Sequence, residues 1–592
     1  MKDFMKYVLA TVVGLFVFGI IMAVFGLMSI VGMVASGEAT QSAGKNSVLV
    51  LNLNTSINEQ GDDNMLASFM GGGSPATGLN DILSAIKKAT VNDNIKGIYI
   101  EAGQMSAGFA SAQEIRNALK DFKESGKWIV AYADNYTQGS YYLASVADKV
   151  FLNPKGDFDW RGLASQPMYM KDLYEKVGIK FQVVKVGTYK SATEMYTETK
   201  MSEANREQVT AYVNGLWQNI CNAVAESRNL NVDSLNAYAD KMLDFEDPEK
   251  IVAYGLVDSL IYADQVKVEV KKMLEIDNDK TISQLSVADM KNVKGKKNKG
   301  EKIAVYYAYG DIVQNAGNNF YQQGHQIVGT DITADLEKLA NDDEVKAVVV
   351  RVNSPGGDAY ASEQIWHAIT NIKEKKPVVI SMGDYAASGG YYMSCPASWI
   401  VAQPTTLTGS IGIFGVFPDF SELVTKKLGV HFDEVKTNKN SGFGNLMARP
   451  FNAEETASLQ TYINRGYELF RQRVAEGRNI PVDEVEKIAQ GRVWIGQDAI
   501  DIKLVDQLGS LDDAIAKAAE LAGLEEYYTS AYPGAKGMLE QLLSSASGAR
   551  GNYLDEQMKA MLGDFYQPYV IMKSAEEQPV MQARVPFLIP VR

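Results

Sequence analysis

The stretch VKAVVVRVNSPGGDA (345–359) determines the fold class, because a mostly apolar, β-branched run leads directly into a turn. A short apolar run bounded by Pro and Gly is typical of a strand that is buried on both faces of a parallel sheet. A helical stretch, ASEQIWHAITNIKEK (361–375), follows it, and then a second strand-like run, PVVISM (377–382). Strands that alternate with helices predict an α/β layer fold with a largely parallel sheet.

This pattern occurs twice along the chain. Residues 93–154 align with residues 343–404 without a gap, at a constant offset of 250, and the matched pairs include Asp134/Asp384 and Gly139/Gly389. Unrelated segments would agree at roughly 5% of positions, or about three residues here. The offset is far longer than that of a solenoid repeat, so we predict two whole tandem domains. The predicted units are a membrane segment and linker (1–45), a first domain (46–290), a basic linker (291–301), a second domain (302–528) and a C-terminal tail (529–592).

The N-terminus predicts the compartment. No charged residue lies between Tyr7 and Gly37, and most positions there are apolar. A bilayer core needs about 20 apolar residues, whereas a cleaved signal peptide has an apolar region of only about 7–15. We therefore expect one uncleaved transmembrane helix over about residues 8–32, with a buried core helix as the alternative. Lys2 and Lys6 precede it, so the positive-inside rule places the main body outside the cytoplasm.

The composition excludes several classes of function. A net charge of −14 argues against a nucleic-acid binder, because phosphate contacts require clustered Lys and Arg. Two Cys exclude a disulfide scaffold and a Cys-based zinc cluster, although pairing of Cys221 with Cys395 stays open. The stretch KNVKGKKNKGEK (291–302) is a solvated linker or, alternatively, a polyanion-binding patch. GGGSP (71–75) lacks the Lys-Ser/Thr ending of a P-loop, and the tail after about residue 530 is partly helical in pattern without recognisable chemistry.

Candidate chemistry lies where the two copies differ. The turn Pro355-Gly356-Gly357 allows a close approach of backbone to ligand, and the first copy has lost it. Ser388 precedes Gly389 at a predicted strand-to-helix turn, where the first copy has Gln138. A serine in this position lies near backbone amides that can stabilise an oxyanion. The alternative is a serine that only caps the helix.

A serine nucleophile needs a base. His367 falls within a predicted helix, and His431 lies in LGVHF, which is similar to VGIKF of the first copy, so both are more typical of structural residues. His325, in the polar stretch FYQQGHQ, remains a candidate. A lysine is the other possibility, because burial can lower its pKa by several units from about 10.4. Composition alone cannot select among 58 basic residues.

Several motifs together resemble those of bacterial signal peptide peptidase A, in its long, membrane-anchored form with duplicated domains. The resemblance covers nearly the whole chain, from the expected anchor to about residue 525. The motifs that carry it are VGTYKSATEMYT (186–197), GLWQNI (215–220), RVNSPGG (351–357), SGGYY (388–392), LTGSIGIFG (407–415) and GRVWIGQDA (491–499). The resemblance implies tandem domains similar to the crotonase and Clp-type peptidase fold. It also implies a serine endopeptidase that degrades released signal peptides and other short apolar peptides at the inner membrane, facing the periplasm or outside, as a homotetramer.

The resemblance also implies the roles of single residues. Ser388 is expected to be the nucleophile and Lys190, from the first copy, the general base, with Ser410 orienting the lysine amine. The backbone N–H groups of Gly357 and Gly389 are expected to form the oxyanion hole, with Gly356 as an alternative donor to Gly357. No metal or other cofactor is expected. A crotonase-like acyl-CoA enzyme and a non-catalytic membrane scaffold are the rival interpretations.

Overall fold

The computed structural model describes residues 42–61, 76–295, 298–316, 325–534 and 579–585, with isolated positions between 6 and 22. Most of the predicted transmembrane span, at residues 8–32, and the GGGSP loop lie outside these residues. Within the described part of the chain, no helix combines the length and the hydropathy that crossing a bilayer requires.

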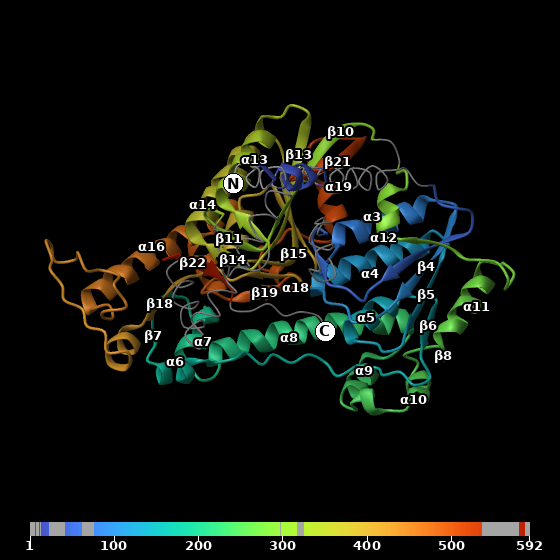
Figure 1. Ribbon diagram of the computed structural model, residues 1–592, viewed down its shortest axis with the longest axis horizontal. Coiled ribbons are helices and arrows are strands. Elements are labelled where there is room, and N and C mark those ends of the chain that lie inside the picture. The colour runs from blue at the N-terminus through green and yellow to red at the C-terminus, as the bar shows by residue number, and fades with distance from the viewer. Residues whose placement is uncertain are drawn as a thin grey trace.

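The first copy is built on a six-stranded parallel sheet in the order β8-β6-β5-β4-β1-β9 (Figure 1). Its strands are β1 (Ser47–Asn52), β4 (Ile95–Glu101), β5 (Trp128–Ala133), β6 (Lys149–Leu152), β8 (Ser259–Leu260) and β9 (Ser283–Ser286). Its helices are α3 (Leu79–Val91), α4 (Phe109–Glu124), α5 (Gln138–Ala144), α6 (Lys171–Val177), α7 (Glu194–Thr197), α8 (Glu203–Arg228), α9 (Val232–Ala239), α10 (Pro248–Ala253), α11 (Ala263–Met273) and α12 (Val287–Asn292), and β2 (Ile57–Asn58) pairs with β3 (Thr77–Gly78).

The second copy repeats this plan in a larger sheet, along the path β19-β17-β15-β13-β10-β21. Its strands are β10 (Glu301–Tyr309), β13 (Val345–Ser354), β15 (Val378–Ala387), β16 (Trp399–Ala402), β17 (Leu407–Gly409), β19 (Val493–Ile495), β20 (Gln507–Leu508) and β21 (Tyr527–Tyr532). Its helices are α13 (Gly329–Asn341), α14 (Ala359–Lys373), α15 (Gly389–Ser394), α16 (Ala453–Arg478), α17 (Val482–Ile488), α18 (Gly496–Ala499) and α19 (Leu511–Leu521).

The offset of 250 persists in the structure. It relates β4 to β13, α4 to α14, β6 to β16 and α8 to α16, and both long helices end at a left-handed asparagine, Asn229 and Asn479. The predicted α/β class, the parallel pairing and the duplication are therefore confirmed, whereas the exact domain boundaries stay a prediction.

Burial explains why β13 has so few polar positions. Its central residues are buried on both faces, since α14 packs on one side through Ile365 and Ile369, and α19 packs on the other through Ala514 and Ala518. A strand covered by helices on both faces needs a continuous apolar run.

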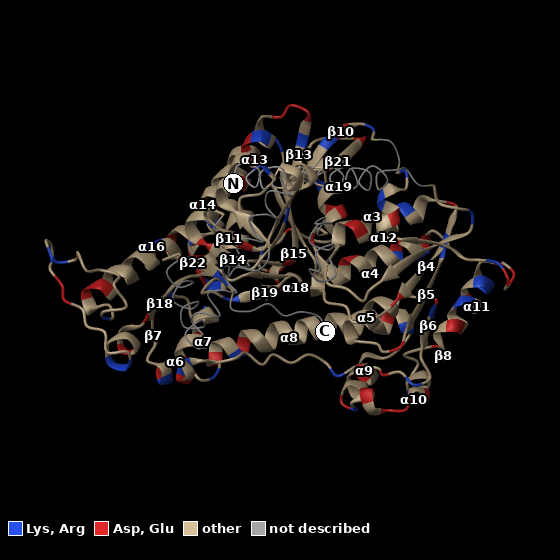
Figure 2. Ribbon diagram, in the orientation of Figure 1, with Lys and Arg blue, Asp and Glu red and all other residues tan. Residues whose placement is uncertain are grey.

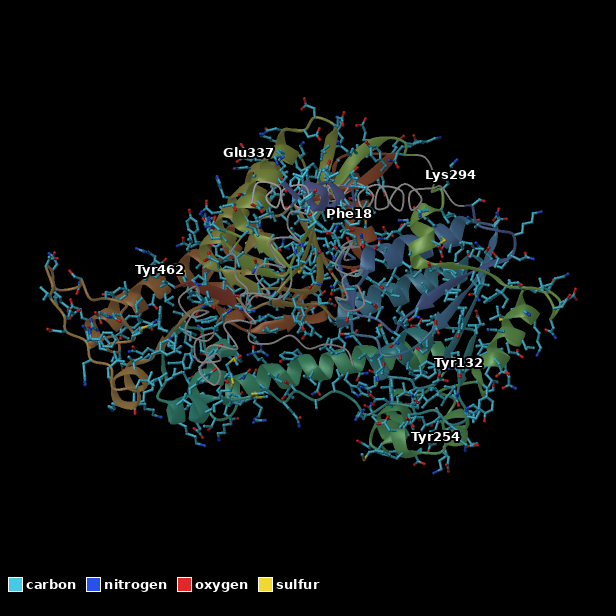
Figure 3. All side chains as sticks on the ribbon, in the orientation of Figure 1. Phe18, Tyr132, Tyr254, Lys294, Glu337 and Tyr462 are labelled. Atoms are coloured by element: carbon cyan, nitrogen blue, oxygen red, sulfur yellow. The ribbon has the colours of Figure 1, made fainter. Side chains whose placement is uncertain are left out.

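Charged residues lie on outer helices such as α11 (Figure 2). The side chains of Glu337 and Tyr462 project outward from α13 and α16 (Figure 3).

A third sheet joins the two copies. Its order is β12-β11-β14-β22-β18-β7, and it contains β7 (Lys180–Val186) from the first copy beside β18 (Ile413–Asp419) from the second. The other strands are β11 (Asp311–Val313), β12 (Gln326–Val328), β14 (Gly356–Asp358) and β22 (Gln582–Arg584). Because β7 crosses into the second copy, the residues that follow it reach the turn after β15.

Candidate active site

Ser388 lies at the junction between strand β15 and helix α15, as the sequence predicts. Its backbone adopts φ 55° and ψ −114°, a conformation that costs a non-glycine residue about 1–3 kcal/mol. The Ser388 N–H donates to the carbonyl oxygen of Gly409 at 2.8 Å, and the side chain is buried. Strain of this kind persists only where surrounding contacts fix it, and it is concentrated at functional residues.

Lys190 comes from the first copy and reaches the second. It follows β7, and only 1% of it is exposed. Its Nζ lies 2.7 Å from the Oγ of Ser388, 2.9 Å from the Oγ of Ser410 and 3.0 Å from the carbonyl oxygen of Ser410. The structure therefore brings two of the predicted site residues, Ser388 and Ser410, within hydrogen-bond distance of a third, the Lys190 amine.

The second copy fixes the loop that carries Lys190. The N–H of Tyr189 donates to the carbonyl oxygen of Gln490 at 2.8 Å. A Cβ atom on Gly491 would lie 2.7 Å from the backbone N and the Cβ of Lys190, and a Cβ on Gly412 would lie 3.2 Å from its Cδ. The lysine fits this place because glycines line it on two sides.

Burial lowers the pKa of the Lys190 amine well below its ordinary value of 10.5. A neutral amine has two N–H donors and one lone pair. The carbonyl oxygen of Ser410 can only accept, so one N–H donates to it, and the other donates to the Ser410 hydroxyl oxygen. The lone pair then faces the Ser388 hydroxyl, so the amine is arranged to take its proton.

The predicted oxyanion donors lie on two segments that touch. Gly389 is the first residue of α15, and Gly357 lies in β14 directly after Gly356. Gly356 has φ +105°, a conformation that favours glycine, and a Cβ atom built on it would lie 2.8 Å from the N of Gly389. Backbone N–H groups from two neighbouring segments can therefore converge on one oxygen.

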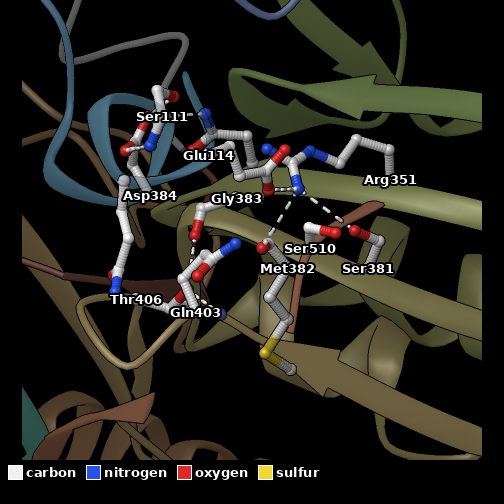
Figure 4. A network of polar contacts seen from close by, with 12 residues as sticks. Ser111, Glu114, Arg351, Ser381, Met382, Gly383, Asp384, Gln403, Thr406 and Ser510 are labelled. Atoms are coloured by element: carbon white, nitrogen blue, oxygen red, sulfur yellow. Dashed lines mark hydrogen bonds and ion pairs between the residues drawn. The ribbon is translucent and has the colours of Figure 1, made fainter. Parts of the chain in front are cut away.

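A buried charge cluster joins the two copies near these strands. Arg351 on β13 donates from Nη1 to Oε1 of Glu114 at 2.6 Å (Figure 4) and from Nε to Oε2 of Glu59 at 2.9 Å. Asp384 on β15 accepts hydrogen bonds from the N–H and the hydroxyl of Ser111, at the start of α4 (Figure 4). Because β13 and β15 continue to the glycine turn and to Ser388, these contacts hold the first copy against the strands that carry the site.

The first copy uses the corresponding position differently. Gln138 accepts hydrogen bonds from the N–H groups of Arg161 and Gly162 at 2.9 and 2.8 Å, and its Nε2 donates to the Gly162 carbonyl oxygen at 3.0 Å. The side chain that replaces Ser388 in this copy thus anchors a loop.

Between the described residues, no hydrogen bond joins Ser388 to any of the three histidines that the sequence offered as a base. The ring of His325 stacks on Tyr309 with 3.7 Å between centroids, His367 lies within α14, and His431 is exposed. The basic side chain that lies beside the Ser388 hydroxyl is that of Lys190. Cys221 and Cys395 are both buried and are not paired with each other.

Two features were missed by the sequence analysis. Arg351 interrupts an apolar strand, and a buried charge requires a partner, so this residue was a usable signal for the charge cluster. The C-terminal tail, to which no chemistry was assigned, contributes strand β22 beside β14. Its segment Gln582–Arg584 is short and has no alternating pattern that would indicate a strand.

Comparison with known proteins gives consistent matches over both copies. The family model Peptidase family S49 matches residues 121–277 and 370–525, and the model Clp protease matches residues 299–399. "Protease 4" from Salmonella typhi is 38% identical over 497 residues, which cover 82% of this chain and 78% of that protein. "Serine protease SPPA, chloroplastic" from Arabidopsis thaliana is 31% identical, covering 82% and 70%. "Putative signal peptide peptidase SppA" from Enterococcus faecium is 34% identical, covering 36% and 62%.

The two matches to the S49 model fall one on each copy, and together they span more than half of the chain. The relatives from Salmonella typhi and Arabidopsis thaliana match across both copies as well. This chain therefore belongs to Peptidase family S49, as a serine protease with a duplicated domain.

Proposed function

We propose that this chain is a membrane-anchored endopeptidase that degrades released signal peptides with Ser388 as nucleophile and Lys190 as general base. The observation that carries the proposal is the distance of 2.7 Å between the Lys190 Nζ and the Ser388 Oγ. Burial alone lowers the pKa of Lys190, and no carboxylate among the described residues offsets it. A lysine buried in this way is costly unless it is neutral, and a neutral amine beside a hydroxyl can act as a general base.

The chemistry follows from these positions. Lys190 accepts the Ser388 proton while the Oγ bonds to the scissile carbonyl carbon, and the carbonyl electron pair moves onto the oxygen. The N–H groups of Gly357 and Gly389 donate to this oxyanion, which stabilises the transition state by about 3 kcal/mol per donor. Ser410 orients the amine by accepting its N–H groups. Protonated Lys190 then gives its proton to the departing amine as the C–N bond breaks.

The acyl-enzyme is resolved by the same residues. Neutral Lys190 takes a proton from water, the resulting hydroxide oxygen bonds to the acyl carbon, and the Oγ of Ser388 leaves with the proton that Lys190 returns. The cycle restores both side chains and consumes one water.

The substrate class rests on the resemblance. The motifs of this chain resemble those of signal peptide peptidase A, and the relative from Enterococcus faecium is named "Putative signal peptide peptidase SppA". An anchor at about residues 8–32 would hold the site beside the bilayer, on the periplasmic or outer side, where such peptides are released. The homotetramer is likewise proposed from the resemblance.

The rival functions fit the geometry less well. An acyl-CoA enzyme that relies on an oxyanion hole has no use for a buried amine beside a serine hydroxyl. A non-catalytic scaffold gains nothing from a strained Ser388 backbone and a desolvated Lys190, both of which cost stability.

The proposal is tested with the full chain, purified in detergent, and a synthetic signal peptide offered in two forms. We expect the free peptide to be cleaved at internal bonds, and the same sequence still joined to a folded protein to be cleaved at least about tenfold more slowly, since a strand-like substrate must be extended. Fragments are identified by mass spectrometry, with Ser388→Ala as the control. Turnover of an acyl-CoA thioester without cleavage of any peptide would contradict the proposal.

The glycines beside Lys190 give a second test. Gly491→Ala is expected to lower kcat by about tenfold or more, because the new Cβ would lie 2.7 Å from the Lys190 backbone and must displace the amine. Gly126→Ala is the matched control: its φ of +80° nearly equals the +79° of Gly491, but a Cβ there meets nothing within 4 Å. Equal kcat values in the two variants would show that contact with the lysine is unimportant.

A further inference from the structure

A strand from the C-terminal tail lies between β14 and β18, next to Gly389, the residue that follows Ser388. Strand β22 pairs antiparallel with β14, through Gly356↔Arg584, Gly357↔Ala583 and Asp358↔Gln582, and it touches β18 through Phe414↔Gln582. It thereby fills the space between β14 and β18 in the sheet that joins the two copies. An extended peptide that adds to the edge of a sheet binds in this same way.

The register puts the carbonyl group of Ala583 at the predicted oxyanion donors. The N–H of Val585 donates to the Pro355 carbonyl oxygen at 2.9 Å, and the N–H of Ala359 donates to the Met581 carbonyl oxygen at 3.3 Å. Hydrogen-bonded pairs alternate along an antiparallel ladder, so the pair between these two, Gly357 and Ala583, is also a hydrogen-bonding one.

Gly356 and Gly389 place the same carbonyl oxygen independently. A Cβ atom on Gly356 would lie 2.0 Å from the Ala583 oxygen, and a Cβ on Gly389 would lie 3.1 Å from it. The Ala583 oxygen therefore sits among the glycines expected to stabilise an oxyanion. A substrate carbonyl under attack by Ser388 would take this place.

The side chains of the strand also fit as those of a substrate would. Ala583 is fully buried, and the Val585 side chain enters a pocket with Tyr385 and Leu407 of the second copy and Tyr212 of the first. A cavity of about 20 Å³ remains beside it. Arg584, between these two residues, instead faces outward and pairs with Asp311 at 2.8 Å.

We propose that the segment Met581–Val585 is an intramolecular competitor, which occupies the substrate groove and must leave before a peptide can bind. The proposal rests on the proposed function, because it takes Ser388 and the glycine donors to be the peptidase site. It also predicts the preferred substrate: a small residue whose carbonyl is attacked, and an aliphatic residue two positions later in a pocket that both copies build.

The kinetic test uses the full chain and two truncations. A chain that ends at residue 578 lacks the strand, and a chain that ends at Val585 keeps it. If the strand holds the groove about nine-tenths of the time, its removal lowers the apparent KM for a short peptide about tenfold with kcat unchanged. The chain ending at Val585 should behave as the full chain does. Equal KM values in all three would overturn the proposal.

A binding experiment separates this proposal from the proposed function, because it requires no catalysis. In a Ser388→Ala background, a fluorescent peptide of residues 579–585, PVMQARV, is titrated into the full chain and into the chain ending at residue 578. We expect about tenfold tighter binding to the truncated chain, by fluorescence anisotropy. Tight binding would support the competitor even if Ser388 were not the nucleophile, and equal binding to both chains would contradict it.

A point variant guards against loss of fold in the truncated chain. Val585→Asp puts a carboxylate into the pocket beside Tyr385 and Leu407, so the strand is expected to leave and the KM to fall as in the truncation. Val580→Asp is the matched control on the same segment, because the Val580 side chain is exposed. A lower KM in the control alone would contradict the assigned register.

Discussion

Replacing Lys190 with methionine is expected to lower kcat/KM for peptide hydrolysis by about 10⁴-fold or more, and Ser388→Ala should have an effect of the same size. Methionine keeps the volume of the buried side chain but cannot take a proton. Because the two residues act as one unit, the double variant should be about as active as either single one. Lys185→Ala is the control and should retain full activity, because Lys185 is exposed and lies on β7, the strand that precedes Lys190. A double variant far less active than both single ones would mean that the residues act separately.

The dependence of kcat/KM on pH identifies which protonation state of the Lys190 amine is active in catalysis. Catalysis needs neutral Lys190, so kcat/KM rises as pH increases through the pKa of the lysine. Burial lowers this pKa well below 10.5, so the rising limb is expected at a pH well below 10. The limb should be absent from any residual activity of Lys190→Met. An unchanged limb and unchanged activity in that variant would return His325 to consideration as the base.

The parts of the fold that follow from local pattern could be predicted. The apolar run at 345–352 lies within β13, the run at 377–382 overlaps β15 from its first residue, and the duplication was visible as a constant offset. A continuous apolar run identifies such strands because a strand covered on both faces must be apolar throughout. The meeting of Lys190 with Ser388 is of a different kind. The two residues are 198 positions apart, and no local rule relates β7 to β18, so the pair came from resemblance to a family.

What the sequence could not reveal depends on contacts between distant segments. Glu59 and Glu114 look like ordinary surface carboxylates in the sequence, and only packing of one copy on the other buries them against Arg351. The strand formed by Gln582–Arg584 is equally invisible, because its pairing is determined by the edge of β14 and not by its own propensity.

The second large effect, a loss of folding stability, is expected when Arg351 is replaced. At pH 8, where Glu114 with its pKa of about 7 is ionised, Arg351→Met would leave the carboxylates of Glu59 and Glu114 buried without their cation. Breaking a buried pair in this way costs about 3–5 kcal/mol. We expect a lower thermal unfolding temperature and, since β13 continues into the glycine turn, a lower kcat as well. Arg473→Met is the control, because that arginine forms a more exposed ion pair with Glu363 and should cost less. Equal losses in both variants would mean that burial of the cluster is unimportant.

Protonation of Glu114 makes the same cluster sensitive to pH. Burial is the main cause that raises the pKa of Glu114 to about 7, and the neighbouring Glu59 and Asp384 add to it, while Arg351 opposes it. An unfolded glutamate has a pKa of about 4.3, so between about pH 4.5 and 7 the folded chain holds a proton that the unfolded chain has lost. Stability contributed by this proton is present at low pH and is lost as pH rises through 7, at most about 1.4 kcal/mol per pH unit.

Glu114→Gln separates this contribution from all the others. The amide is neutral at every pH, so the fall in unfolding temperature between about pH 5 and 7 should become shallower, and at pH 8 the variant should be at least as stable as the wild type. Glu124→Gln, at the exposed end of the same helix, should leave the slope unchanged. A slope that persists in Glu114→Gln would mean that the carboxylate is ionised throughout. Arg351 would then pair with two fully ionised carboxylates, those of Glu59 and Glu114. Neutralising Glu114 would then lower the stability of the buried charge cluster instead of raising it.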